Sequence, residues 1–261
     1  MLMVILTGGI DLSVGSIAAF SAVVFTTLLD TRTSDGMPLV PAFLLTVLLS
    51  LCFGAAVGFL IAYQKMAPFV VTLASMTAAR GVAYMISHAK TIPITNEIVT
   101  TFNKDRLFGV PYSVILAGLV VIIVSLILRY TSYGRYVKAI GSNENSVRLS
   151  GIRTNLYVMS VYMLSAFLCV FGGIMESRTG VGDARICDGM ELDAIAACVI
   201  GGASLSGGRG TPVNTLMGAL ILGLISNIMA LMKVASYPQQ VIKGIIIIVA
   251  VLLQGHNRKE G

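Results

Sequence analysis

Two short stretches of this sequence place small polar residues among glycines at the edge of an apolar segment. The first reads Gly8-Gly9-Ile10-Asp11-Leu12-Ser13-Val14-Gly15, and the second reads Gly201-Gly202-Ala203-Ser204-Leu205-Ser206-Gly207-Gly208. Both fit Gly-Gly-x-x-Leu-Ser-x-Gly, and we call them the first and the second glycine signature. Through side chains or exposed backbone, the following residues could hydrogen-bond a polar solute: Gly8, Gly9, Asp11, Ser13, Gly201, Gly202, Ser204 and Ser206.

Such a break in an apolar segment frees backbone N–H and C=O groups. A membrane tolerates them only where protein or a water-filled cavity satisfies them. Two breaks in corresponding parts of two halves therefore predict a pathway or gate for a transported solute.

Asp11 has a second interpretation, because an ionisable group near a membrane is costly unless it is paired, solvated or capping. Asp11 or Ser13 could cap the helix that follows, while the glycines allow helices to pack closely. We favour capping for the individual atoms, and Glu191 and Asp193 fit the same role before the second signature.

The composition places the chain in a membrane. Of its 261 residues, 56% are hydrophobic and only 11% are charged, against about 25% charged in a soluble domain. The net charge of +6 does not indicate nucleic-acid binding, because basic residues do not cluster with aromatic ones. The four cysteines show no metal-binding spacing and suggest no disulfide pair.

The apolar pattern predicts an all-α, polytopic helical bundle. A spanning helix needs about 20 mostly apolar residues, and six segments fit: Pro41 to Tyr63, Pro68 to Ser87, Tyr112 to Arg129, Asn155 to Ser177, Thr211 to Met232 and Pro238 to Leu253. Two shorter segments, Ser13 to Leu29 and Leu192 to Ile200, each adjoin a glycine signature. We expect discontinuous or re-entrant helices there.

The loop charges predict an orientation. The connection between Arg129 and Asn155 is the most basic, and the C-terminal tail carries Arg258 and Lys259. Placing both in the cytoplasm agrees with the positive-inside rule.

Several longer motifs resemble the permease subunits of bacterial ABC importers for monosaccharides, of the ribose and galactoside type. They occur in the family's order along the whole chain: Ile5 to Ser16, Ala67 to Leu73, Gly134 to Glu144, Leu149 to Ile152, Glu191 to Ala197, Gly201 to Thr211 and Gln239 to Gly244. The resemblance implies one transmembrane permease domain over residues 1–261. Because the family begins with additional membrane sequence, we expect an N-terminal truncation.

The resemblance implies that residues 132–154 are a cytoplasmic coupling loop that meets an ATPase subunit. Ser142 is a good N-cap, the stretch from Asn143 to Ser150 can form two helical turns, and Gly151 is a natural terminator. Residues expected to contact the ATPase are Arg135, Lys138, Asn143, Glu144, Arg148 and Gly151. The alternative is an ordinary basic loop that only fixes topology.

Other polar residues within spans have simpler roles. Arg80 and Lys243 fall near the outer ends of their helices and can extend their charges to the membrane surface. Asn227, Gln239 and Gln240 could line a polar pathway or join helices by hydrogen bonds. The chain has no phosphate-binding loop, catalytic triad or metal site.

The sequence therefore predicts a non-enzymatic, multi-pass permease subunit of an ATP-driven monosaccharide importer in the bacterial inner membrane. The expected partners are an ABC ATPase that binds ATP and Mg, an extracytoplasmic sugar-binding protein, a second permease copy and the lipid bilayer. No cofactor, catalytic residue or nucleic acid is expected for this chain. The alternatives are an ion-coupled secondary transporter and a non-functional permease fragment. The transported sugar stays open among ribose, galactose or galactosides and similar sugars.

Overall fold

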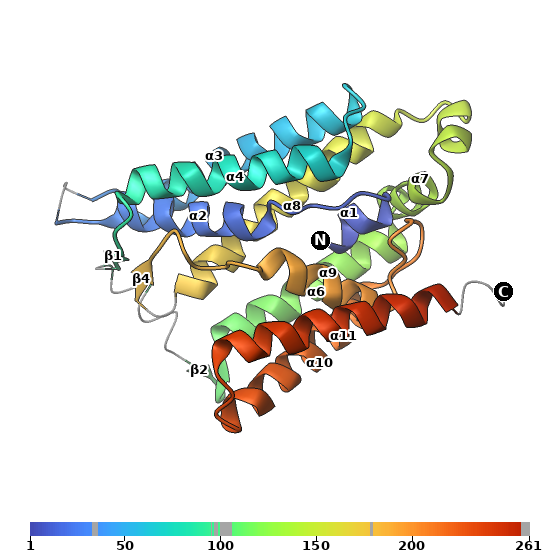
Figure 1. The fold of residues 1–261 in the computed structure, drawn as a ribbon. Helices are drawn as coiled ribbons and strands as arrows, with labels where there is room; N and C mark the ends of the chain where they lie inside the picture. Colours follow the sequence, from blue (N-terminus) through green and yellow to red (C-terminus); the bar gives the residue numbers. More distant parts are fainter. Residues whose placement is uncertain (33–35, 95, 97–98, 100–105, 178–179, 257–261) are drawn as a thin grey trace. The chain divides into compact units, whose positions relative to one another are not determined.

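The computed structural model describes residues 1–32, 36–94, 96, 99, 106–177 and 180–256. Its described helices are α1 (Leu2–Leu6), α2 (Val14–Leu29), α3 (Leu39–Ala62), α4 (Pro68–Ser87), α6 (Tyr112–Tyr130), α7 (Ser132–Leu149), α8 (Thr154–Glu176), α9 (Met190–Ile200), α10 (Pro212–Leu231) and α11 (Ser236–His256) (Figure 1). The short strands are β1 (Ile92–Pro93), β2 (Arg106–Leu107), β3 (Val110–Pro111) and β4 (Val181–Gly182). The predicted all-α membrane bundle is confirmed.

Among the described residues, five helices are long and apolar enough to cross a membrane: α3, α4, α6, α8 and α10. They match five of the six predicted spans to within two residues at either end. The sixth predicted span, Pro238 to Leu253, lies inside α11. The two shorter segments form α2 and α9, and neither is among the helices of spanning length. Arg258 and Lys259 lie outside the described residues.

The chain divides into two compact units, which we describe separately. Unit 1 comprises residues 1–9, 121–152 and 192–261, and unit 2 comprises residues 10–120 and 153–191. The division falls within the first glycine signature, between Gly9 and Ile10.

Unit 2 is built around α2, which packs against α3, α4 and α8 (Figure 1). Gly54 and Gly58 of α3 let that helix approach α8 closely: a Cβ built on either would lie under 3 Å from a backbone carbonyl oxygen of α8. Small residues at such a spacing let membrane helices pack closely. Strands β1 and β4 pair antiparallel and join the end of α4 to the segment before α9. Strands β2 and β3 form a hairpin whose turn is Phe108–Gly109.

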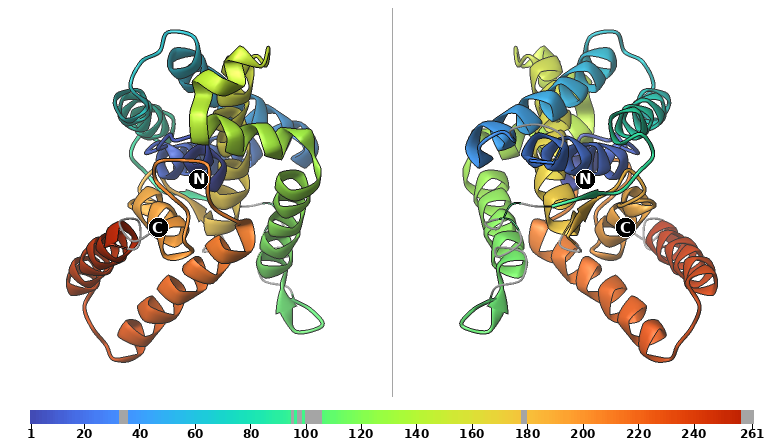
Figure 2. Two further views of the ribbon diagram at one scale, coloured as in Figure 1. Left: turned by 90° about the vertical axis from the view of Figure 1, so that its right-hand side faces the viewer. Right: turned by 90° about the vertical axis from the view of Figure 1, so that its left-hand side faces the viewer.

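Unit 1 contains α1, α7, α10, α11 and the part of α9 from Leu192 onward. Ala196 and Ala197 of α9 form a small core with Leu222 of α10, and Ile246 of α11 packs against it. An ion pair of 2.9 Å joins Asp193 of α9 to Lys243 of α11. Figure 2 shows α10 and α11 as two long helices connected by a short turn.

The predicted coupling loop is largely helical. Helix α7 begins at Ser132 and reaches Leu149, with one extended residue, Asn143, interrupting it. Thr131 caps the first part, and its hydroxyl accepts a hydrogen bond from the Gly134 N–H. The helix extends before residue 142 as well, with a buried face that includes Gly134, Val137 and Ile140.

Candidate functional site

The first glycine signature ends α1 with a regular C-terminal motif. The Gly8 N–H bonds to the Ile5 carbonyl at 2.9 Å, and the Gly9 N–H bonds to the Val4 carbonyl at 3.0 Å. Gly8 has φ +80°, a left-handed conformation that glycine adopts at low cost. This pair of bonds is the Schellman arrangement, which satisfies carbonyls that a helix end would leave free.

The second glycine signature ends α9 in the same way, but one position later in the motif. The Gly202 N–H bonds to the Val199 carbonyl, and the Ala203 N–H bonds to the Cys198 carbonyl, both at 2.8 Å. Gly202 has φ +80°, so Gly202 is the structural equivalent of Gly8 rather than of Gly9. Both signatures therefore end a helix with the same backbone bonds. The glycine with φ +80° is the first of its pair in the first signature and the second of its pair in the second.

After the first break, Asp11 connects the chain to α8 of unit 2. Its Oδ1 accepts hydrogen bonds from the N–H and the hydroxyl of Ser13, and its Oδ2 accepts one from the Ser165 hydroxyl at 2.8 Å. Asp11 is only 2% exposed. On the other side, the Thr72 hydroxyl of α4 donates to the Ile10 carbonyl at 3.3 Å. The segment between α1 and α2 is thus held from two helices.

The predicted N-cap position of Ser13 before α2 is confirmed, but the predicted capping bond is absent. Ser13 occupies the N-cap position, but its side chain makes no capping bond and instead donates to Asp11. Asp11 instead accepts hydrogen bonds from Ser13 and from Ser165 of α8. Asp11 and Ser165 lie 154 positions apart in the sequence, so local sequence patterns do not predict this contact. That either residue lines a pathway stays a prediction.

After the second break, the chain forms a turn before α10. The Ser204 N–H bonds to the Arg209 carbonyl, and the Gly207 N–H bonds to the Ser204 carbonyl, both at 2.9 Å. Ser206 is exposed. Thr211 then caps α10, since its hydroxyl accepts from the Asn214 N–H, and Pro212 follows as the first helical residue.

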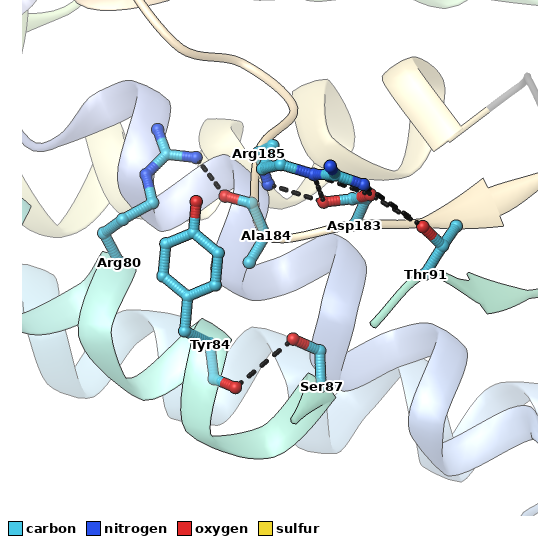
Figure 3. Close-up of polar contacts among 7 residues, drawn as sticks. All are labelled: Arg80, Tyr84, Ser87, Thr91, Asp183, Ala184 and Arg185. Carbon is cyan, nitrogen blue, oxygen red and sulfur yellow. Dashed lines mark hydrogen bonds and ion pairs between the residues drawn. The ribbon is translucent and has the colours of Figure 1, made fainter. Parts of the chain in front are cut away.

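Arg80 of α4 holds a loop of unit 2 (Figure 3). Its Nη1 donates to the carbonyls of Ala184 and Ile186, and its Nε donates to the Ser16 hydroxyl of α2 at 3.2 Å. The segment before α9 supplies these acceptors, a contact that the interpretation of Arg80 as a residue extending to the membrane surface did not include. That interpretation stays a prediction. Lys243 pairs with Asp193, which lies inside α9 and not at its N-cap as predicted.

A second contact fixes the same loop near β1. Arg185 forms an ion pair of 2.6 Å with Asp183, and the Thr91 hydroxyl donates to Asp183 Oδ2 at 2.9 Å (Figure 3). The bonds from Arg185 hold the pKa of Asp183 well below its ordinary value. The pair therefore stabilises the fold at neutral pH and loses that contribution as the pH falls below about 3.9, the ordinary aspartate pKa. Because Arg185 is largely exposed, this contribution is small.

Replacing Arg80 by lysine is expected to raise the rate at which maleimide labels Cys187 several-fold. Burial raises the pKa of Cys187 to about 12, so its thiol should react slowly in the wild type. A lysine keeps the positive charge but cannot reach Ser16 and both loop carbonyls at once. The measurement uses a variant in which Cys187 is the sole cysteine.

The matched control for this prediction is Arg153→Lys, at an exposed arginine of the same unit. It should leave the labelling rate unchanged. An Arg80→Lys rate equal to that of the wild type would show that the loop does not depend on the guanidinium.

The residues predicted to contact an ATPase lie along α7. Asn143, rather than Ser142, caps the short final part, because its Oδ1 accepts from the Ser146 N–H at 3.0 Å. Gly151 follows the helix with φ +82°, as its predicted terminator role requires. Arg135 donates to the Ser132 hydroxyl and Arg148 to Asn145, both along the exposed helix surface. Lys138 and Glu144 are half-buried.

The three predicted polar lining residues occupy different surroundings in unit 1. Gln239 is half-buried and donates to the Val234 carbonyl at 2.8 Å, which closes the turn between α10 and α11. Asn227 and Gln240 are exposed. The sequence analysis did not identify three residues that contact the glycine signatures: Ser165, Thr72 and Gly141. Their one common feature is a position on a packed helix face, which is not a recognisable sequence motif.

These features define a multi-pass helical membrane protein with two helices broken at glycines. Over residues 1–251, the chain matches the family model described as branched-chain amino acid transport system / permease component. The chain belongs to this family of transport permeases.

Characterised relatives cover nearly all of the chain. It is 37% identical to the ribose import permease protein RbsC of Escherichia coli (strain K12), over 100% of this chain and 81% of the relative. It is 40% identical to RbsC of Bacillus subtilis (strain 168), over 97% of this chain and 78% of the relative. The L-arabinose ABC transporter permease protein AraH of Azospirillum brasilense is 33% identical, over 100% of this chain and 76% of the relative. No solved structure matches the chain.

Proposed function

We propose that this chain is a transmembrane subunit of an ABC importer that moves a monosaccharide across the bacterial inner membrane. The main support is the combination of two helices broken at glycines with relatives named for ribose and L-arabinose along the whole chain. Hydroxyl groups of a sugar need donors and acceptors together, and the hydroxyls of small polar residues beside helix breaks can act as both.

In this proposal ATP and Mg are bound by a separate ATPase subunit, and the sugar arrives from an extracytoplasmic binding protein. A second permease copy completes the pathway. The short helix over residues 144–149 lies on the cytoplasmic side and contacts the ATPase. Its outer surface supports this role, because Asn145, Arg148 and Leu149 are all exposed.

The test is uptake into proteoliposomes that contain this chain, its ATPase subunit and its binding protein. Radiolabelled ribose, arabinose and galactose are supplied separately. We expect uptake of at least one sugar that requires ATP inside the vesicle and is unchanged when proton and sodium gradients are collapsed. Uptake that survives ATP removal but stops when a gradient is collapsed would instead indicate a secondary transporter. No uptake of any of the three sugars would contradict the proposed substrate class.

A further inference from the structure

Three backbone segments of unit 1 meet at one point, where only backbone atoms lie nearest to Gly141 and Gly207. They are the end of α1 at Leu6, the middle of α7 at Gly141, and the second glycine signature at Gly207 and Gly208. The Gly208 N–H donates a 2.9 Å hydrogen bond to the Leu6 carbonyl. The three segments are far apart in the sequence.

Glycine is required for this approach. A Cβ built on Gly141 would collide with the Leu6 carbonyl oxygen and lie 2.6 Å from the Gly208 nitrogen. A Cβ built on Gly207 would lie 2.7 Å from the Gly141 carbonyl oxygen. Contacts under 3.0 Å from a Cβ to backbone atoms cannot be relieved by a side-chain rotation, so any larger residue must push a backbone segment away.

The meeting point lies next to the bend of α7. Asn143, two residues after Gly141, is the extended residue that separates the main helix from the short helix over residues 144–149 (Figure 1). Ser142, between them, places its hydroxyl against Gly208. The segment that projects from α7 therefore begins directly at the contact with the second signature.

Each of the other two segments leads into a helix break. The end of α1 continues through Gly8 and Gly9 into the first signature, and Gly207 and Gly208 belong to the second. Because backbone atoms of Leu6 and Gly208 lie directly against Gly141, a displacement of α7 there cannot be accommodated by a side-chain rotation. Tightly packed segments shift as rigid bodies and do not deform gradually, so the two neighbouring segments would move with α7.

We propose that Leu6, Gly141, Gly207 and Gly208 form a backbone joint that carries movement of the short α7 helix to both glycine signatures. Gly141 is its positioning residue. This inference rests on the proposed function, because the movement originates in the ATPase that binds the short helix. The joint couples that movement to the two breaks at once, which would let both change together during a transport cycle.

The experiment replaces Gly141 by alanine in the complete importer in proteoliposomes and measures sugar uptake and ATP hydrolysis together. We expect assembly with the ATPase and ATP hydrolysis to persist, while sugar uptake per ATP hydrolysed falls at least tenfold. A purely structural role would lower both activities in parallel through loss of protein, and would leave their ratio unchanged.

The matched control is Gly223→Ala, at a helical glycine of α10 in the same unit, where a Cβ would meet nothing within 4 Å. It should keep the wild-type ratio. A second pair of variants covers the case in which Gly141→Ala fails to assemble. Ser142 is exposed, so Ser142→Val adds a methyl group beside Gly208 with little risk to the fold, and Ser142→Ala adds nothing. We expect valine alone to lower the ratio.

A wild-type ratio in both Gly141→Ala and Ser142→Val would overturn the joint. If the wild-type importer itself shows no ATP-dependent uptake, the proposed function fails instead, and the two failures are thereby distinguished.

Discussion

Replacing Asp11 by alanine is expected to detach the first glycine signature from α8 and to lower the stability of the folded protein by about 3 kcal/mol. The change leaves the buried N–H of Ser13 without its acceptor, which costs roughly 1–3 kcal/mol. It also removes the bond from Ser165, and hydrogen bonds between membrane helices contribute about 1 kcal/mol. Thermal unfolding in detergent measures the loss as a lower melting temperature.

Two variants separate the contributions. Ser165→Ala removes only the bond to α8, so its melting temperature should fall less than that of Asp11→Ala. Asp11→Asn keeps one carbonyl oxygen for Ser13 and offers an amide N–H to the Ser165 hydroxyl, which can rotate to accept it. We therefore expect Asp11→Asn to remain folded and to transport normally.

The outcome of Asp11→Asn also tests the alternative mechanism. If this variant folds normally but loses transport, the negative charge itself is required, as in an ion-coupled transporter. If Asp11→Ala melts at the same temperature as the wild type, the carboxylate does not fasten the segment.

The spans and the breaks could be predicted because they depend on composition over many residues. A run such as Pro68 to Ser87 is mostly apolar and begins with a proline, and the structure places α4 over the same residues. The glycine signatures were likewise recognisable, since a break in an apolar segment is tolerated in a membrane only where the freed backbone groups are satisfied.

The finer geometry depends on contacts between distant parts of the chain. Whether the first or the second glycine of a pair takes φ +80° depends on where the preceding helix stops, so the offset between Gly8 and Gly202 is not encoded in the motif letters. Arg80 was placed by its distance along a helix, which ignores the loop that folds back to accept its hydrogen bonds. Gly141 drew no prediction of its own, because only the close approach of Leu6 and Gly208 to it shows why a glycine is needed inside α7.

Replacing Leu149 by aspartate is expected to reduce co-purification of the ATPase subunit at least tenfold. Leu149 is 87% exposed at the end of the short α7 helix, beside the exposed polar residues Arg148 and Ser150. In the proposed coupling role, the short helix buries this leucine against the ATPase subunit. Burying one leucine contributes about 1.5–3 kcal/mol, and about 1.4 kcal/mol corresponds to tenfold in affinity.

Leu149→Met is the matched control, because methionine keeps the apolar volume and should retain the ATPase. Leu107→Asp provides a second control, since this leucine is also exposed but lies on the β2–β3 hairpin. Deleting residues 143–150 should remove the association entirely. If Leu149→Asp retains the ATPase as well as Leu149→Met does, the short helix is only a basic connection that fixes topology. The coupling role would then fail, and so would the joint at Gly141, because the ATPase would no longer move the short helix.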